Sequence, residues 1–126
     1  MYGFSVTLND SVENGIARVT EALKEEGFGI LTEIDVKATL KKKLDVEFDK
    51  YIILGACNPP SAHKALKAER DVGLMLPCNV IVYDQEGKTF VSAILPTAAM
   101  EMIDNPELKK VAEEVEEKLK RVINAV

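Results

Sequence analysis

The sequence contains few residues of the types that carry metal or nucleophilic chemistry. It has two cysteines, Cys57 and Cys78, and one histidine, His63, among its 126 residues. A mononuclear zinc site needs three or four ligands, so all three side chains would have to converge to form the smallest one. The sequence also has no Cys-x-x-Cys pair, no Gly-x-Ser-x-Gly turn and no phosphate-binding loop. These absences identify no catalytic residue and favour a function other than catalysis.

The charge balance and the short apolar runs exclude two classes of partner. Sixteen Lys and Arg residues stand against 21 Asp and Glu residues, which gives a formal net charge of −5. Nucleic-acid binding needs clustered Lys and Arg, and the run Lys41-Lys42-Lys43 is short enough to be a solvated turn. No apolar run approaches the ~20 residues of a membrane span, and no signal-peptide pattern opens the chain. We therefore expect a cytoplasmic protein with reduced thiols and with neither nucleic acid nor membrane as partner.

Alternating strand and helix patterns predict one α+β domain over residues 1–126. We expect a mainly antiparallel sheet of about five strands, packed with helices that include a long C-terminal one. Expected strands cover residues 2–8, 28–34, 46–55, 78–83 and 89–95, with a hairpin turn at 84–88. Expected helices cover residues 12–23, 36–44, 59–69 and 98–103, and a last helix starts at Asn105-Pro106.

The third expected strand ends in a continuous apolar run. From Tyr51 to Cys57 it has no polar alternation. Such a run predicts a strand that is covered on both faces, or on one face with a subunit interface on the other.

Two short segments, one around each cysteine, have similar sequences. Ala56-Cys57-Asn58-Pro59-Pro60 and Leu76-Pro77-Cys78-Asn79-Val80 each place asparagine after cysteine and proline close by. In the first segment, Asn58 suits a helix N-cap because the following proline holds its backbone extended. Cys57 would then lie beside the positive end of a helix dipole, where thiols are more reactive, and free N–H groups near Ser61 and Ala62 could hold a small anion. Alternatively, the turn needs these residues only for folding, and the cysteine is a small core residue.

The remaining candidates are open to both structural and functional interpretations. Cys78 begins an apolar strand and is typical of a core position. The two thiols can meet only if the third and fourth strands run antiparallel with neighbouring ends, because a parallel crossover would place them at opposite ends of the sheet. His63 suits the surface better than a ligand set. Met75, Met100 and Met102 fill either the core or a pliable apolar pocket.

The segments Gly55–Leu66 and Gly73–Tyr83, with their paired Cys-Asn motifs, resemble the prokaryotic family called domain of unknown function 302. The Gly3-Phe4 strand and the region from Met100 to the terminal helix are also similar to that family. The resemblance implies an α+β domain with a TATA-binding-protein-like arrangement, a homodimer, and no established activity.

Two functions of different classes follow as hypotheses. The first is a homodimeric small-ligand-binding or accessory module, whose pocket lies near the Cys-Asn motifs and uses Cys57, Asn58, Pro59, Cys78 and Asn79. The alternative is a sulfur carrier, redox sensor or soft-metal-binding protein that uses Cys57 and Cys78, with His63 as a third metal ligand. Neither hypothesis identifies a cofactor.

Overall fold

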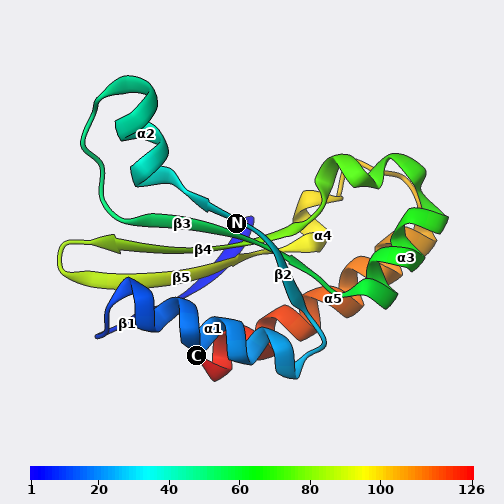
Figure 1. Cartoon of the computed structure of the whole chain (residues 1–126). Coiled ribbons are helices and arrows are strands. Elements are labelled where there is room, and N and C mark those ends of the chain that lie inside the picture. The colour runs from blue at the N-terminus through cyan, green and yellow to red at the C-terminus, as the bar shows by residue number, and fades with distance from the viewer.

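A computed structural model describes all 126 residues as an α+β fold with a five-stranded antiparallel sheet (Figure 1). The strand order is β1-β5-β4-β3-β2, and every neighbouring pair is antiparallel. The strands are β1 (Gly3–Leu8), β2 (Gly29–Asp35), β3 (Tyr51–Cys57), β4 (Cys78–Gln85) and β5 (Lys88–Ile94). The α-helices are α1 (Val12–Glu25), α2 (Val36–Leu44), α3 (Pro59–Ala68), α4 (Pro96–Ala99) and α5 (Pro106–Ala125), and residues Arg70–Met75 form a 3₁₀-helix, η1. The predicted fold class is confirmed.

Local sequence signals set where the main helices begin. In each case a side-chain oxygen of the N-cap residue accepts a hydrogen bond from a backbone N–H of the first turn, which would otherwise lack a partner. The capping residues are Ser11 for α1, Asp35 for α2, Asn58 for α3 and Asn105 for α5. The chain leaves α1 through Gly27, whose φ of 82° suits a residue without a Cβ.

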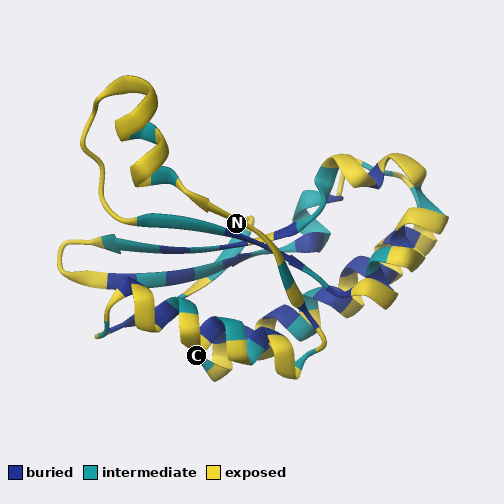
Figure 2. Cartoon of the chain, viewed as in Figure 1, coloured by how far each residue is buried: buried dark blue, intermediate teal, exposed yellow.

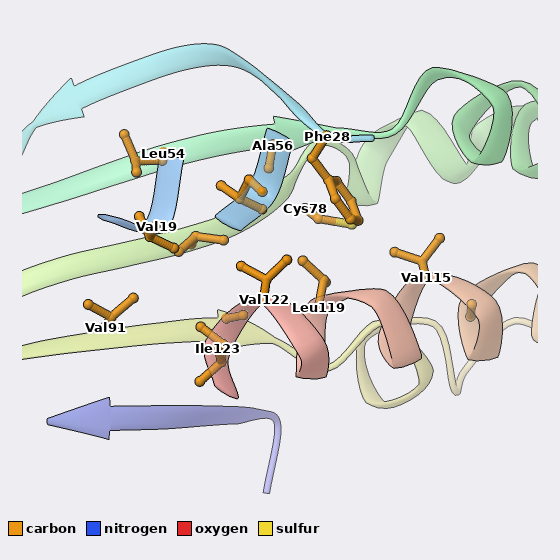
Figure 3. Close-up of a cluster of buried hydrophobic side chains, with 14 of the residues drawn as sticks. Val19, Phe28, Leu54, Ala56, Cys78, Val91, Val115, Leu119, Val122 and Ile123 are labelled. Carbon is orange, nitrogen blue, oxygen red and sulfur yellow. The ribbon is translucent and has the colours of Figure 1, made fainter. Parts of the chain in front are cut away.

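The core lies between one face of the sheet and the helices α1 and α5 (Figures 1 and 3). Alternate residues of the central strands point toward these helices, and the apolar stripes of the two helices face the sheet. The side chains with no exposed surface include Val19, Leu23, Leu54, Val80, Val82, Val91, Leu119 and Val122. Burial of each such side chain stabilises the fold by about 1.5–3 kcal/mol before the entropic cost of ordering.

The opposite face of the sheet has no helix across its central strands (Figure 1). It carries a stack of aromatic rings, in which Tyr51 lies 5.1 Å from Tyr83 and Tyr83 lies 5.2 Å from Phe90, between ring centroids. Ile53 and Ile81 form the next cross-strand pair, and all five side chains are only partly buried. We call these five residues the open face. The apolar β3 strand is therefore covered on one face only.

Residues 36–48, which comprise α2 and the segment after it, project from the sheet, and we call them the α2 arm (Figures 1 and 2). No residue of α2 is buried. The exposed large apolar side chains of the arm are Leu44, Val46 and Phe48, and Ile34 at the adjoining end of β2 is also exposed. Lys41-Lys42-Lys43 forms the exposed last turn of α2, where cations interact favourably with the helix dipole.

Some predicted boundaries were wrong. The third strand begins at Tyr51 instead of residue 46, because Asp45 ends α2 with a positive φ of 54° and the chain then returns to the sheet without pairing. The helix expected at 98–103 is the single turn Pro96–Ala99. The 3₁₀-helix η1 was not predicted, because a short run such as Arg70–Met75 has no distinct apolar period.

Candidate functional site: an apolar cavity beside the two cysteines

The sheet brings both Cys-Asn motifs to one end. Cys57 is the last residue of β3 and Cys78 is the first residue of β4. These strands are antiparallel, and Ala56 pairs with Cys78 across them. The two cysteines therefore lie on adjacent strands at the same end of the sheet, which is the arrangement that their meeting required. Both are free thiols.

A cavity of about 310 Å³ lies at this end of the sheet, between α3, α5 and the strand termini. Thirteen of its 17 lining residues are hydrophobic. Small side chains leave the space open, because Ala62 and Ala65 of α3 and Ala112 of α5 line it where larger residues would fill it. In Figure 3, the ring of Phe28 extends toward Cys78 beside this part of the core.

The two thiols differ in their surroundings. Cys78 is buried, and this burial raises the pKa of its thiol from the ordinary value of 9.0 to about 11, with the neighbouring Cys57 acting in the same direction. The Cys78 thiol is therefore protonated at neutral pH. Cys57 is half-buried, so it is the thiol that solvent reaches more readily. Both residues line the cavity.

Asn58 also lines the cavity, but its amide is engaged in the fold. Its Oδ1 accepts a hydrogen bond from the backbone N–H of Ser61 at 3.2 Å. Its Nδ2 donates to the backbone carbonyl of Glu26 at 3.1 Å. Gly27 permits this approach, because a Cβ there would lie 3.1 Å from the Asn58 Nδ2. Asn58 thus joins the start of α3 to the end of α1.

The expected anion site at the start of α3 was wrong. Pro59 and Pro60 have no N–H group. The Ser61 N–H is taken by the Asn58 side chain, and the Ala62 N–H donates to the Asn58 backbone carbonyl at 2.9 Å. The first turn of α3 therefore has no free donor to offer an anion.

Three other predicted site residues lie away from the cavity. Pro59 is exposed at the first position of α3, and Asn79 is exposed because the side chain after Cys78 points to the other face of the sheet. His63 is exposed on α3 and does not line the cavity. No three His, Cys, Asp or Glu side chains gather closely enough to hold a metal ion. The structure therefore does not bring His63 to the cysteines as a third ligand.

Of the three methionines, Met100 fits the pocket alternative and Met75 the core alternative, whereas Met102 fits neither. Met100 is buried and lines the cavity, Met75 packs against the core, and Met102 is 82% exposed.

Several lining residues were not predicted from the sequence. Leu31 and Leu66 are exposed lining residues that come from β2 and α3. Ser61 lines the cavity, and α5 contributes Val111 and Val115. The small residues Ser61, Ala62 and Ala65 at helical spacing were the available signal, since small residues on one helix face permit either close packing or open space. Sequence alone does not distinguish these two outcomes.

Comparison with known families identifies the chain. The family model described as domain of unknown function DUF302 matches residues 4–126. The chain belongs to the DUF302 family. Three chains of solved structures match it, including the crystal structure of an uncharacterized conserved DUF302 protein from Bacillus stearothermophilus. That protein is 32% identical, the match covers 99% of this chain and 98% of the other, and the TM-score is 0.93.

No curated protein matches this DUF302 chain. The α-helices give no candidate for a membrane span, since none combines the required length with sufficient apolar character.

Proposed function

We propose that this DUF302 protein is a homodimeric small-ligand-binding module whose ligand site is the cavity beside Cys57 and Cys78. The observation that carries the proposal is the cavity itself, which has a volume of about 310 Å³ and an almost wholly apolar lining. Ligand sites typically occupy about 300–1,000 Å³ and combine an apolar lining with a few polar groups. The lining residue Ser61 supplies such a group here.

The surrounding packing supports a binding role. Protein interiors are close-packed, and a void deprives the atoms around it of dispersion contacts. Four alanines line this cavity, namely Ala56, Ala62, Ala65 and Ala112, and three of them are buried. A single larger side chain at one of these positions would fill part of the space. A ligand restores the missing contacts without such a substitution.

The dimer part of the proposal is supported by the α2 arm. A nine-residue helix is marginal in water on its own, yet α2 buries no residue in this chain. Val36, Leu40 and Leu44 follow one another at four-residue spacing and so lie on one face of the helix. A partner that covers this face would stabilise the arm.

A second copy of the chain is the partner that fits. One chain carries both an apolar arm and the open face, so a two-fold axis can place each arm on the open face of the other copy. A stable interface buries about 800 Å² per partner, and its fully buried centre is more apolar than the rest of the surface. The arm, the open face and Ile34 of β2 together carry eleven large apolar side chains: Ile34, Val36, Leu40, Leu44, Val46, Phe48, Tyr51, Ile53, Ile81, Tyr83 and Phe90.

Titration with one neutral and one charged probe tests the ligand site. The probes are naphthalene and 2-naphthoate, and their binding to the native protein is followed by ¹H–¹⁵N chemical shifts. We expect at least one probe to shift the amides around Cys57 and Ala112 saturably. Ala65→Leu should abolish this binding by filling the cavity, whereas Ala38→Leu on the exposed face of α2 should not. Absence of saturable binding by both probes would overturn the proposed site.

The molar mass in solution tests the dimer. Light scattering after size-exclusion chromatography should give twice the chain mass of 13.9 kDa. Leu44→Lys in the arm should give a monomer, because it places a charge in the proposed interface. Leu74→Lys is the matched control, since Leu74 is 89% exposed outside the arm and the open face. A monomeric native protein at micromolar concentration would exclude the dimer.

Thiol chemistry is a second candidate function. The observation that favours it is the position of Cys57 and Cys78 on adjacent strands, both lining one cavity. Such a pair suits a sulfur carrier or a redox sensor in which Cys57, the more accessible thiol, reacts first.

Timed alkylation of the native protein at pH 7.5, read by mass spectrometry, tests this function. It requires fast labelling of Cys57, which Cys57→Ser should abolish while Cys78→Ser leaves it unchanged. If both thiols react only after denaturation, the thiol function is excluded.

A further inference from the structure

We infer that the ligand of the cavity is an uncharged, mainly apolar molecule with one hydrogen-bonding group. The inference rests on the proposed function, since it names the class of ligand for the same site. Four observations carry it: the absence of charge in the lining, the closed first turn of α3, an unpartnered serine hydroxyl, and the size and rim of the cavity.

The lining contains no residue that would pair with a charge. None of its 17 side chains is Lys, Arg, His, Asp or Glu. Moving an ion from water into an apolar site without a partner is costly, and the cost rises as the site becomes drier. A carboxylate, phosphate or ammonium group inside this cavity would have no opposite charge to offset that cost.

The start of α3 offers no replacement for a charged partner. Helix N-termini bind anions through free backbone N–H groups. Here Pro59 and Pro60 remove two of these groups, and hydrogen bonds to Asn58 occupy those of Ser61 and Ala62. The one feature of the site that could have favoured an anion is therefore closed by the Asn-Pro-Pro sequence itself.

Ser61 provides the single polar contact. It is 5% exposed and lines the cavity, and its hydroxyl makes no hydrogen bond to the protein, although its backbone N–H does. No fully enclosed side-chain polar atom lacks a partner, so this hydroxyl keeps some accessible surface on a residue that borders the cavity. A hydroxyl can both donate and accept. A ligand hydroxyl, carbonyl or ether oxygen would satisfy it.

The size and the rim define the apolar part of the ligand. An apolar cavity of about 150 Å³ accepts benzene, so the observed 310 Å³ suits a molecule with about twice as many non-hydrogen atoms. Leu31 and Leu66 are the exposed apolar residues of the lining and come from two different elements. An apolar rim favours entry of an apolar molecule from water. A two-ring aromatic molecule or a chain of about ten carbons fits this description.

Three matched probes test the ligand class on the native protein at pH 7.5: naphthalene, 2-naphthol and 2-naphthoate. Titrations followed by ¹H–¹⁵N chemical shifts give the dissociation constants. We expect 2-naphthol to bind about fivefold to tenfold more tightly than naphthalene, because it adds one hydrogen bond. We expect 2-naphthoate to bind at least about tenfold more weakly than naphthalene, because its carboxylate must lose water without gaining a partner.

Ser61→Ala tests the polar contact, and retained naphthalene binding shows that this variant is folded. The variant should lower 2-naphthol affinity to that of naphthalene, and an unchanged preference for 2-naphthol would overturn the contact. Binding of 2-naphthoate as tight as that of naphthalene, abolished by Ala65→Leu, would overturn the ligand class and leave the proposed site standing. Absence of saturable binding by all three probes would overturn the site and the class together.

Discussion

Asn58 connects two parts of the fold, so its replacement by alanine should cost more than the loss of a helix cap. The Asn58 Oδ1 caps α3 through the Ser61 N–H, and the Nδ2 donates to the Glu26 carbonyl at the end of α1. An N-cap is worth about 1 kcal/mol. Loss of the second hydrogen bond, at a site where Asn58 is 7% exposed, adds about 1 kcal/mol. We expect Asn58→Ala to lower the free energy of unfolding by about 2 kcal/mol.

Urea denaturation followed by far-ultraviolet circular dichroism measures this loss, with all proteins at one concentration because a dimer makes stability concentration-dependent. In a chain of 126 residues, 1 kcal/mol corresponds to about 4 °C in Tm, so Asn58→Ala should melt about 8 °C lower. Asn58→Ser separates the two contributions, because serine caps a helix well but is too short to reach Glu26. It should lose about 1 kcal/mol.

Ser11→Ala is the matched control for a cap alone, since the Ser11 hydroxyl accepts from the Asn14 N–H at 3.0 Å and makes no second bond of this kind. It should lose about 1 kcal/mol. The reasoning fails if Asn58→Ala costs less than about 0.5 kcal/mol, or if Asn58→Ser costs as much as Asn58→Ala.

Three further predictions concern stability. Burial raises the pKa of the Cys78 thiol to about 11, whereas the same thiol in the unfolded chain loses its proton above the ordinary 9.0. The free energy of unfolding should therefore fall by about 1.4 kcal/mol per pH unit from pH 9 toward pH 11. Denaturation at pH 8 and pH 10 should show a smaller fall in Cys78→Ala, and equal falls would contradict the argument. Gly55→Ala should lower the free energy of unfolding by about 1–3 kcal/mol, because the new Cβ would lie 2.7 Å from the Pro77 ring and closer still to Thr32. An unchanged stability in urea denaturation would mean that Pro77 and Thr32 move aside without cost. Leu119→Ala, at a site with no exposed surface, should cost about 2–5 kcal/mol by the same measurement, and less than about 1 kcal/mol would mean that the core collapses around it.

Short-range patterns predicted most of the elements correctly, because helix ends depend on residues within one turn. The Asn58-Pro59-Pro60 run predicted both the cap and the start of α3, and Asp35 predicted the start of α2. The third strand was extended too far toward the N-terminus, since its apolar residues at 46 and 48 belong to the arm. Their exposure depends on what lies across them in space, which local pattern does not specify.

The candidate site could be predicted only in part. Of the residues that the motifs singled out, Cys57, Asn58 and Cys78 line the cavity, whereas Pro59 and Asn79 do not. Asn79 follows Cys78 in the chain but points to the other face of the sheet, because strand side chains alternate. Adjacency in sequence was therefore a poor guide within β4.

The sequence by itself determined which residues start and end the helices, which strands are apolar, and that a thiol precedes a capped helix. These features depend on hydrogen bonds and side-chain periods that span a few residues. Only the tertiary structure decided that β3 and β4 run antiparallel, so that Cys57 and Cys78 share one end of the sheet. It also placed Val111 and Val115 of α5 beside these cysteines, although they lie more than 30 residues further along the chain. The small alanine side chains in the same lining leave the space between these elements open. Contacts of this kind depend on how whole elements pack together, and no local pattern contains that information.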